Sequence, residues 1–213
     1  MSSPLKNKTA YQAAFAHSRD KIGHLTPDEI ERRSLCQFDV SGGCFDIPSL
    51  GQRFRVSYPA GMIKWAMTEK DVPLDWALVL LNYLTSAKEK ASAGQWVTYR
   101  DLPSGQVFYG NLERYVLKEL SAWYACHDKN LLSAALDKAG FVPVLGSADL
   151  NMRIDFAPRV PVLLQFWDGD EDMPASSQML FDRDAADQLH IEDLAVVCGI
   201  VRRWLIGTDS STG

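Results

Sequence analysis

The sequence has no apolar run long enough to cross a membrane. Its longest apolar stretch, residues 76–84, is interrupted by Asn82, and a bilayer requires about 20 apolar residues. Residues 1–6 lack the apolar core of a signal peptide. We therefore expect no membrane partner and a cytoplasmic location.

Positive charge is also scarce. The chain has 22 Lys and Arg against 27 Asp and Glu, which gives a formal net charge of −5. Its two arginine pairs, Arg32-Arg33 and Arg202-Arg203, are far apart in the sequence. Because nucleic-acid binding requires a basic face, we expect no nucleic-acid partner.

Cysteine and histidine are few and scattered. The four cysteines form no C-x-x-C pair, and the closest two, Cys36 and Cys44, are eight positions apart. We expect all four to be buried, reduced thiols without a metal. A metal held by Cys36 and Cys44 is the weaker alternative, and the four histidines form no metal-binding pair.

The chain is otherwise rich enough in apolar residues, 46%, to bury a sizeable core. A helix is predicted at residues 73–91, and its positions from Leu74 to Leu84 are apolar around nearly the whole circumference, which predicts a buried central helix. A C-terminal helix beginning near Ile191 and ending before Gly207 has a single apolar face. Further helices are predicted at residues 11–22, from Pro27 with Thr26 as N-cap, at 111–124 and at 129–139.

Strands are predicted where apolar and polar residues alternate or short apolar runs end in turns. They are a hairpin of residues 54–58 and 62–67, a possible third strand at 44–47, and strands at 96–99, 151–156, 162–167 and 179–181. The expected fold is α+β, with an antiparallel sheet packed against the central helix and the amphipathic C-terminal helix. Residues 1–207 should form a single domain with an N-terminal helical arm, and residues 208–213 a disordered tail.

Candidate ligand-binding residues gather around an acidic turn after residue Trp167. Its four acids could supply oxygen ligands to Mg²⁺ or Ca²⁺, but Gly169 favours a turn that scatters them, and the calcium-loop pattern is absent. We therefore expect a scaffold turn without a metal. Arg100 with the Ser104-Gly105 loop could bind an anion or pair with a surface acid. Asp182 or Asp184 is expected to cap the helix that follows, which favours a structural role over catalysis. The candidates are Arg100, Ser104, Trp167, Asp168, Asp170, Glu171 and Asp182.

Three stretches carry a resemblance to a known family. They are Leu80-Leu81-Asn82-Tyr83-Leu84, residues 94–105 from Gly94-Gln95-Trp96 to Leu102-Pro103-Ser104-Gly105, and residues 167–174 followed by Leu180-Phe181-Asp182 and Leu189. Over residues 11–205 the chain resembles an uncharacterised prokaryotic domain family known chiefly from anaerobic bacteria and archaea. The resemblance implies no defined activity. Some longer relatives carry a cysteine-rich iron–sulfur segment. This chain departs from them, because residues 1–35 contain no cysteine and its four scattered thiols are a poor frame for a cluster.

The sequence contains no recognisable catalytic constellation. It has neither a Gly-x-Ser-x-Gly elbow nor a glycine-rich phosphate loop. The leading hypothesis is a non-enzymatic binding or accessory module for a small molecule or protein partner in an anaerobic prokaryote. The alternative is a small-molecule or divalent-metal-dependent enzyme with its site near residues 168–172 and Arg100. No cofactor is identified by the sequence, although the six tryptophans could wall a pocket for a planar one.

Overall fold

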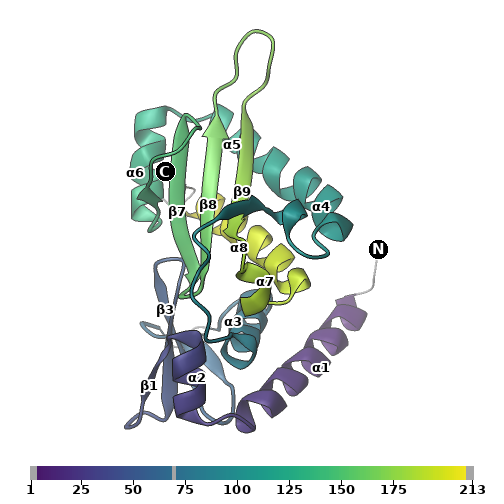
Figure 1. Ribbon diagram of the computed structural model, residues 1–213, viewed down its shortest axis with the longest axis vertical. Helices are drawn as coiled ribbons and strands as arrows, with labels where there is room; N and C mark the ends of the chain where they lie inside the picture. Colours follow the sequence, from purple (N-terminus) through teal and green to yellow (C-terminus); the bar gives the residue numbers. More distant parts are fainter. Residues whose placement is uncertain (1–3, 69–70, 210–213) are drawn as a thin grey trace.

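The computed structural model describes residues 4–68 and 71–209 and arranges their strands in two antiparallel sheets (Figure 1). The small sheet has the order β1 (Gln37–Asp39), β2 (Cys44–Ser49), β3 (Gln52–Ser57) and β4 (Ile63–Trp65). The large sheet has the order β5 (Trp96–Thr98), β9 (Ser176–Asp182), β8 (Val160–Trp167), β7 (Leu150–Ala157) and β6 (Val142–Pro143). The predicted α+β class is confirmed, and the antiparallel pairing is divided between two sheets.

Three helices accompany the small sheet: α1 (Pro4–Gly23), α2 (Pro27–Ser34) and α3 (Leu74–Ser86). The predicted start of α2 is confirmed, because the Thr26 side chain accepts a hydrogen bond from the Glu29 N–H. Helix α3 packs on the small sheet through Trp76, whose indole N–H donates to the Ser49 hydroxyl at 2.9 Å.

Helix α3 is shorter at its C-terminal end than the predicted span of residues 73–91. Pro73 is its N-cap rather than its first residue, and the helix ends at Ser86. The hydroxyls of Thr85 and Ser86 donate to the Asn82 carbonyl, and beyond the C-cap Ala87 the Lys88 N–H donates to the Gln188 side chain. These bonds compete with continuation of the helix.

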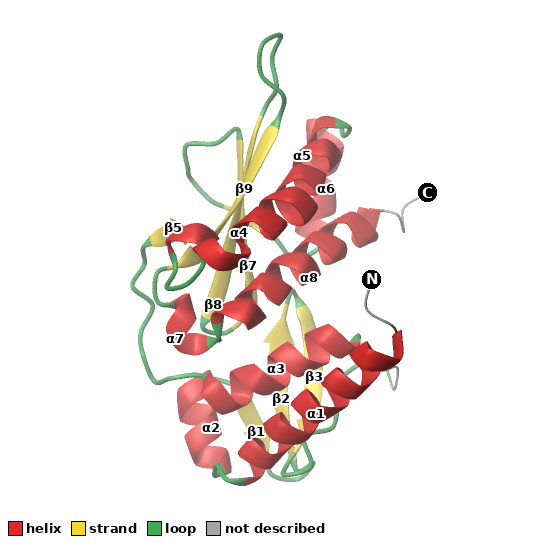
Figure 2. Ribbon diagram, turned by 90° about the vertical axis from the view of Figure 1, so that its right-hand side faces the viewer, coloured by secondary structure: helices red, strands yellow, loops and turns green. Residues whose placement is uncertain are grey.

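The helices of the large sheet lie along one of its faces, as α4, α5, α6 and α8 show in Figure 2. They are α4 (Gln106–Leu112), the π-helix η2 (Glu113–Leu117), α5 (Lys118–Ala125), α6 (Lys129–Lys138), α7 (Ala185–Gln188) and α8 (Ile191–Asp209), preceded by the 3₁₀ turn η1 (Tyr99–Asp101). Alternate residues of β8, from Val160 to Phe166, are fully buried beneath them.

The predicted end of the C-terminal helix before Gly207 is wrong, because α8 continues to Asp209. Of the predicted disordered tail, residues 210–213 lie outside the described residues. Within the described ranges, no helix is both long enough and apolar enough to span a membrane.

Arg159, in the turn between β7 and β8, fastens the two sheets together. Its guanidinium donates to the carbonyl oxygens of Arg32 and Arg33 at the end of α2 and to that of Lys90. Its backbone N–H donates to the buried Tyr83 hydroxyl, which in turn donates to the Ser34 carbonyl. Buried apolar residues of both sheets also form one continuous core.

Candidate ligand-binding groove

The acidic turn, residues 168–175, connects β8 to β9 and projects from the end of the large sheet (Figure 1). The Asp170 carboxylate accepts hydrogen bonds from the backbone N–H groups of Met173 and Asp172 at 2.8 and 2.9 Å. These two bonds lower the pKa of the Asp170 carboxyl below its usual range. Asp170 is therefore turned onto its own backbone and shapes the turn.

Asp168 is held at the base of the acidic turn. Its carboxylate accepts a hydrogen bond of 2.7 Å from the Tyr124 hydroxyl, and its backbone N–H donates to the Asp149 carboxylate. The Tyr124 ring stacks on Phe166 with centroids 4.8 Å apart. Burial, followed by the bond to Asp168, raises the pKa of the Tyr124 hydroxyl, so Tyr124 stays a donor. Glu171 is exposed. The acids of the turn therefore differ in role: Asp170 shapes the turn, Asp168 binds Tyr124, and Glu171 faces solvent.

A groove of about 990 Å³ runs between β9 with the acidic turn on one side and the α4–η2–α5 helix on the other. Trp167 and Asp168 line it at the end nearest the turn. The helix contributes a row of residues spaced four apart, which places them on one face: Tyr109, Glu113, Leu117, Ser121 and Ala125. We call this row the helical wall of the groove.

Sequence reasoning missed the helical wall. The four-residue spacing within the predicted helix at 111–124 was an available signal. That spacing alone does not indicate a groove. The groove is formed because β9 lies beside the helix, in contact with both η2 and α5.

The helical wall contains the π-helical segment η2, and π-helical turns are often found at functional sites. Two carbonyl groups of this segment accept hydrogen bonds from outside the helix. The Leu117 carbonyl accepts from the Ser177 hydroxyl of β9 at 2.8 Å, and the Tyr115 carbonyl accepts from Arg202 of α8. These donors satisfy carbonyls in the wider turn and fix the helical wall against β9.

Arg100 lies next to the far end of the groove. Its guanidinium carbon is 5.4 Å from the ring centroid of Tyr109, which belongs to the helical wall. Ser104 has a φ of 64° and lies outside the groove lining. The turn is fixed by Gly105, where a Cβ would meet the Tyr99 carbonyl oxygen at 1.9 Å. The structure thus brings Trp167 and Asp168 into the groove and Arg100 to its border.

Asp182 lies at the other end of β9, and its buried carboxylate is occupied by bonds within the chain. It accepts hydrogen bonds from the Ser92 hydroxyl at 2.5 Å and from the backbone N–H groups of Ala93, Gly94 and Asp184 at 3.1, 2.8 and 2.9 Å. Burial raises the pKa of Asp182, but these four bonds outweigh it and the net shift is downward. Asp182 therefore holds the loop that precedes β5.

The thiols offer little nucleophilic chemistry. All four are free, and Cys36, Cys44 and Cys198 are buried as predicted. The prediction that Cys126 is buried is wrong, because α5 ends just before it and Cys126, the C-cap, is exposed. Burial raises the pKa of Cys36 to about 12 and also raises that of Cys44, so both stay protonated at neutral pH. In the part of the chain that the structure describes, no three His, Cys, Asp or Glu residues converge as a metal site requires.

Divalent cations should leave the stability of the fold unchanged, because the Asp170 carboxylate already binds its own turn. A cation at a hundredfold excess over its Kd would stabilise the native state by about 2.7 kcal/mol. That corresponds to roughly 5–10 °C at about 2–4 °C per kcal/mol. We expect millimolar Mg²⁺, Mn²⁺ or Ca²⁺ to shift the melting midpoint by no more than about 1 °C. A shift of several degrees that disappears in Asp170→Asn would show a metal site.

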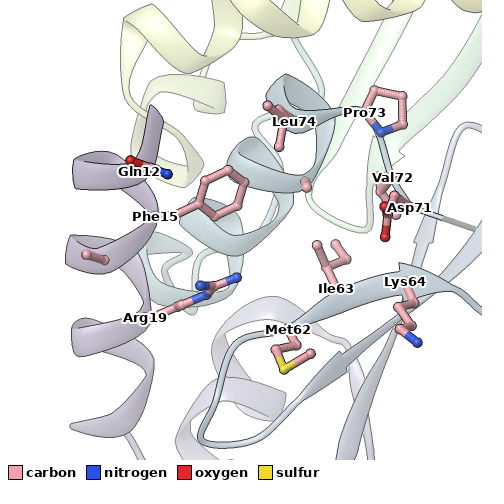
Figure 3. A pocket seen from close by; sticks show the side chains of 12 residues that line it. Gln12, Phe15, Arg19, Met62, Ile63, Lys64, Asp71, Val72, Pro73 and Leu74 are labelled. Carbon is pink, nitrogen blue, oxygen red and sulfur yellow. The ribbon is translucent and has the colours of Figure 1, made fainter. Parts of the chain in front are cut away.

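A second cavity, of about 850 Å³, lies between α1, α3 and β4. Figure 3 shows Phe15 and Arg19 of α1 on one side, facing Met62 and Ile63. The Arg19 side chain donates to the Gly61 carbonyl at 3.3 Å and lies 5.4 Å from the Phe15 ring centroid. Helix α1 therefore forms one wall of this cavity.

A comparison with known protein families matches residues 26–204 to one whose description is a domain of unknown function, DUF3786. No curated protein and no solved structure matches the chain. The match contains the entire groove between β9 and the helical wall, whereas α1, which walls the second cavity, lies before it. We therefore take the groove as the candidate site of this protein. Because the match spans most of the chain, this protein belongs to the DUF3786 family.

Proposed function

We propose that this protein is a non-enzymatic binding or accessory module whose ligand occupies the groove between β9 and the helical wall. The observation that carries the proposal is the groove itself, an open space of about 990 Å³. Aromatic and small side chains line it, together with a few oriented polar groups. Such a mixture of apolar surface and fixed polar groups is typical of binding sites.

The chemistry of the groove supports binding over catalysis. The Asp168 carboxylate, which lines the groove, is occupied by the Tyr124 hydroxyl, and the Asp168 backbone N–H donates to the Asp149 carboxylate. The three buried thiols lie elsewhere. The opposing hypothesis, an enzyme acting near the acidic turn and Arg100, would require these groups to converge on one reacting atom. Instead Arg100 borders the groove through Tyr109, and Trp167 and Asp168 line the end at the acidic turn.

The resemblance to a family known chiefly from anaerobic bacteria and archaea supports an anaerobic prokaryote as the setting. Four free cysteines, three of them buried, are consistent with a reducing cytoplasm. The anaerobic prokaryotic setting and the cytoplasmic location are both part of the proposal.

A fragment screen tests whether the groove is the ligand site. The probes are a library of small aromatic and aliphatic fragments added to ¹⁵N-labelled protein, with chemical-shift changes followed by NMR. We expect fragments to perturb Ser121, Ala122, Ser176 and Ser177, because these residues line the groove. Ala122 is exposed there, so Ala122→Trp should fill the groove without disturbing the core and should abolish these shifts.

The matched control is Ala134→Trp, an exposed alanine of α6 outside the groove, which should leave fragment binding intact. The proposal is overturned if fragments bind only at other surfaces, or if binding at the groove residues survives Ala122→Trp unchanged.

A further inference from the structure

We infer that the groove receives an extended segment of a partner protein, which pairs with the free edge of β9 and places a lysine or arginine beside the acidic turn. This inference rests on the proposed function and names its ligand class. Adding a strand to an exposed sheet edge is an established way for proteins to recognise peptides.

The edge of β9 is covered by β5 over only part of its length. The register pairs Trp96, Val97 and Thr98 with Asp182, Phe181 and Leu180. Strand β9 begins at Ser176, so its first four residues extend past the end of β5. Within the described ranges, β8 is the only strand paired with this part of β9.

The backbone groups that face this edge can be assigned from the alternation of an antiparallel strand. The Arg183 N–H donates to the Gln95 carbonyl at 2.8 Å, so the backbone of Arg183 points away from β8 and toward β5. Every second residue points the same way, which turns the N–H and C=O of Ser177 toward the groove. Ser177 can thus offer both a donor and an acceptor to an added strand.

The cause of the short β5 is the anchoring of Tyr99. Its buried ring packs edge-on against Phe181, and its hydroxyl donates to the Ile191 carbonyl at 2.8 Å. The chain then turns into η1 and α4, and α4 continues as the helical wall. A longer β5 would have continued beside Gln178 and Ser176. Because β5 ends early, this position beside β9 borders the groove.

The dimensions fit a single strand. Residues Tyr109 to Ala125 of the helical wall extend for about 24 Å at the rise of an α-helix. The part of β9 beyond β5 extends for about 13 Å, enough to pair with roughly four residues. A second copy of this chain would bring its own helix beside its own β9, and the two helices would obstruct each other. A flexible segment has no such helix.

Charge complementarity specifies the segment. Residues 167–182 contain five acids and no lysine or arginine, and the acids Asp168, Asp170, Glu171 and Asp172 belong to the acidic turn. On the other side of the groove the helix contributes one acid, Glu113, and the cation Lys118, so the excess of negative charge lies at the acidic turn. There Glu171 and Asp172 are exposed beside the groove end that Trp167 and Asp168 line. A cationic side chain placed there would be attracted, and an acidic segment would be repelled.

The test uses the full chain and a display library of random peptides of about twelve residues, long enough to exceed the paired stretch. Selected peptides are synthesised and their Kd values measured by fluorescence polarisation. We expect selected peptides to contain lysine or arginine and to weaken at least about tenfold on Ala122→Trp, as for loss of a central contact. Glu171→Lys should weaken binding by about fivefold at low salt and less at high salt, whereas the exposed Asp137→Lys on α6, with the same change in net charge, should not.

N-methylation of the peptide backbone, one amide at a time, identifies the binding mode. Strand addition predicts loss of binding at alternate amides, because only every second N–H faces β9, and protection of the Ser177 amide from hydrogen exchange. Methylation losses without this alternation, selected peptides that lack cationic residues, or a dimer through β9 in sedimentation would each overturn the inference. If fragments bind the groove but no selected peptide competes with them, the inference fails while the proposed function stands.

Discussion

Leu81→Ala is expected to lower the free energy of unfolding by about 2–5 kcal/mol, the range for a buried leucine that leaves a cavity. Leu81 is fully buried on α3. A Cβ at Gly61 would lie 3.4 Å from its Cδ1 atom, so the side chain also fills the space beneath that turn. Because α1, the small sheet and α8 all pack around α3, little can collapse into the cavity. Urea denaturation followed by tryptophan fluorescence measures the loss.

Leu74→Ala provides the matched control, with the same chemical change on the same helix. Leu74 is 56% exposed, and surface substitutions usually change stability by less than about 0.5 kcal/mol. The result that would contradict the core assignment is a loss for Leu81→Ala no larger than that for Leu74→Ala.

The sequence predicted well those elements whose signals are local. Thr26, Pro27 and Glu29 together mark the start of α2, and the structure contains the corresponding hydrogen bond. The apolar surface of residues 76–84 likewise identified α3. A helix that is apolar on most sides can be predicted as buried without knowing which elements pack against it. Alternation within residues 151–156 and the run at 162–167 identified β7 and β8, which pair from Leu150 and Phe166 to Ala157 and Val160.

The missed features depend on segments that are distant in the sequence. β1 and β6 have three and two residues, too few for a periodic pattern, and they are strands only because β2 and β7 lie beside them. The start of α4 was placed too late because its N-cap, Gly105, has no side chain to signal it. The groove was missed because its two sides come from segments that are distant in the sequence, residues 109–125 and 167–178. The candidates Trp167 and Asp168 were recognised, but the surface they face was not.

Asp182 illustrates both the reach and the limit of sequence reasoning. The sequence predicted Asp182 or Asp184 as the N-cap of the helix that follows, and the structure has Asp184 at that position, without a side-chain capping bond. The Asp184 N–H donates instead to the Asp182 carboxylate. Three further donors come from residues 92–94, about ninety positions away in the chain. No local pattern reveals a carboxylate that joins such distant segments.

Asp182→Ala should therefore be among the most damaging substitutions in this protein, with a loss of about 2–4 kcal/mol. Hydrogen bonds to a charged group contribute about 1.5–3 kcal/mol each, and part of this is recovered when freed donors reach water. Asp182→Asn should cost less, because the amide oxygen can still accept from the Ala93 or Asp184 N–H. Comparing Asp182→Ala with Asp182→Asn therefore separates the need for a hydrogen-bond acceptor from the need for a negative charge.

The pH dependence of this loss follows from the direction of the pKa shift. The pKa of Asp182 is lower in the folded protein than its ordinary value, so the ionised carboxylate stabilises the fold at pH values above the unfolded pKa of about 4. That stabilisation disappears as the pH falls through the folded pKa. The stability difference between wild type and Asp182→Asn should be constant from neutral pH to about pH 5 and shrink below about pH 4.

Asp172→Asn is the control, because Asp172 is an exposed acid of the acidic turn. Denaturation midpoints measured for wild type and both variants across this pH range compare the two positions directly. A difference for Asp182→Asn that stays the same at every pH, or that matches Asp172→Asn, would contradict the structural role of the ionised carboxylate. Loss of protection from hydrogen exchange confined to the Ala93 and Gly94 amides would show how the damage arises, by release of the loop that leads into β5.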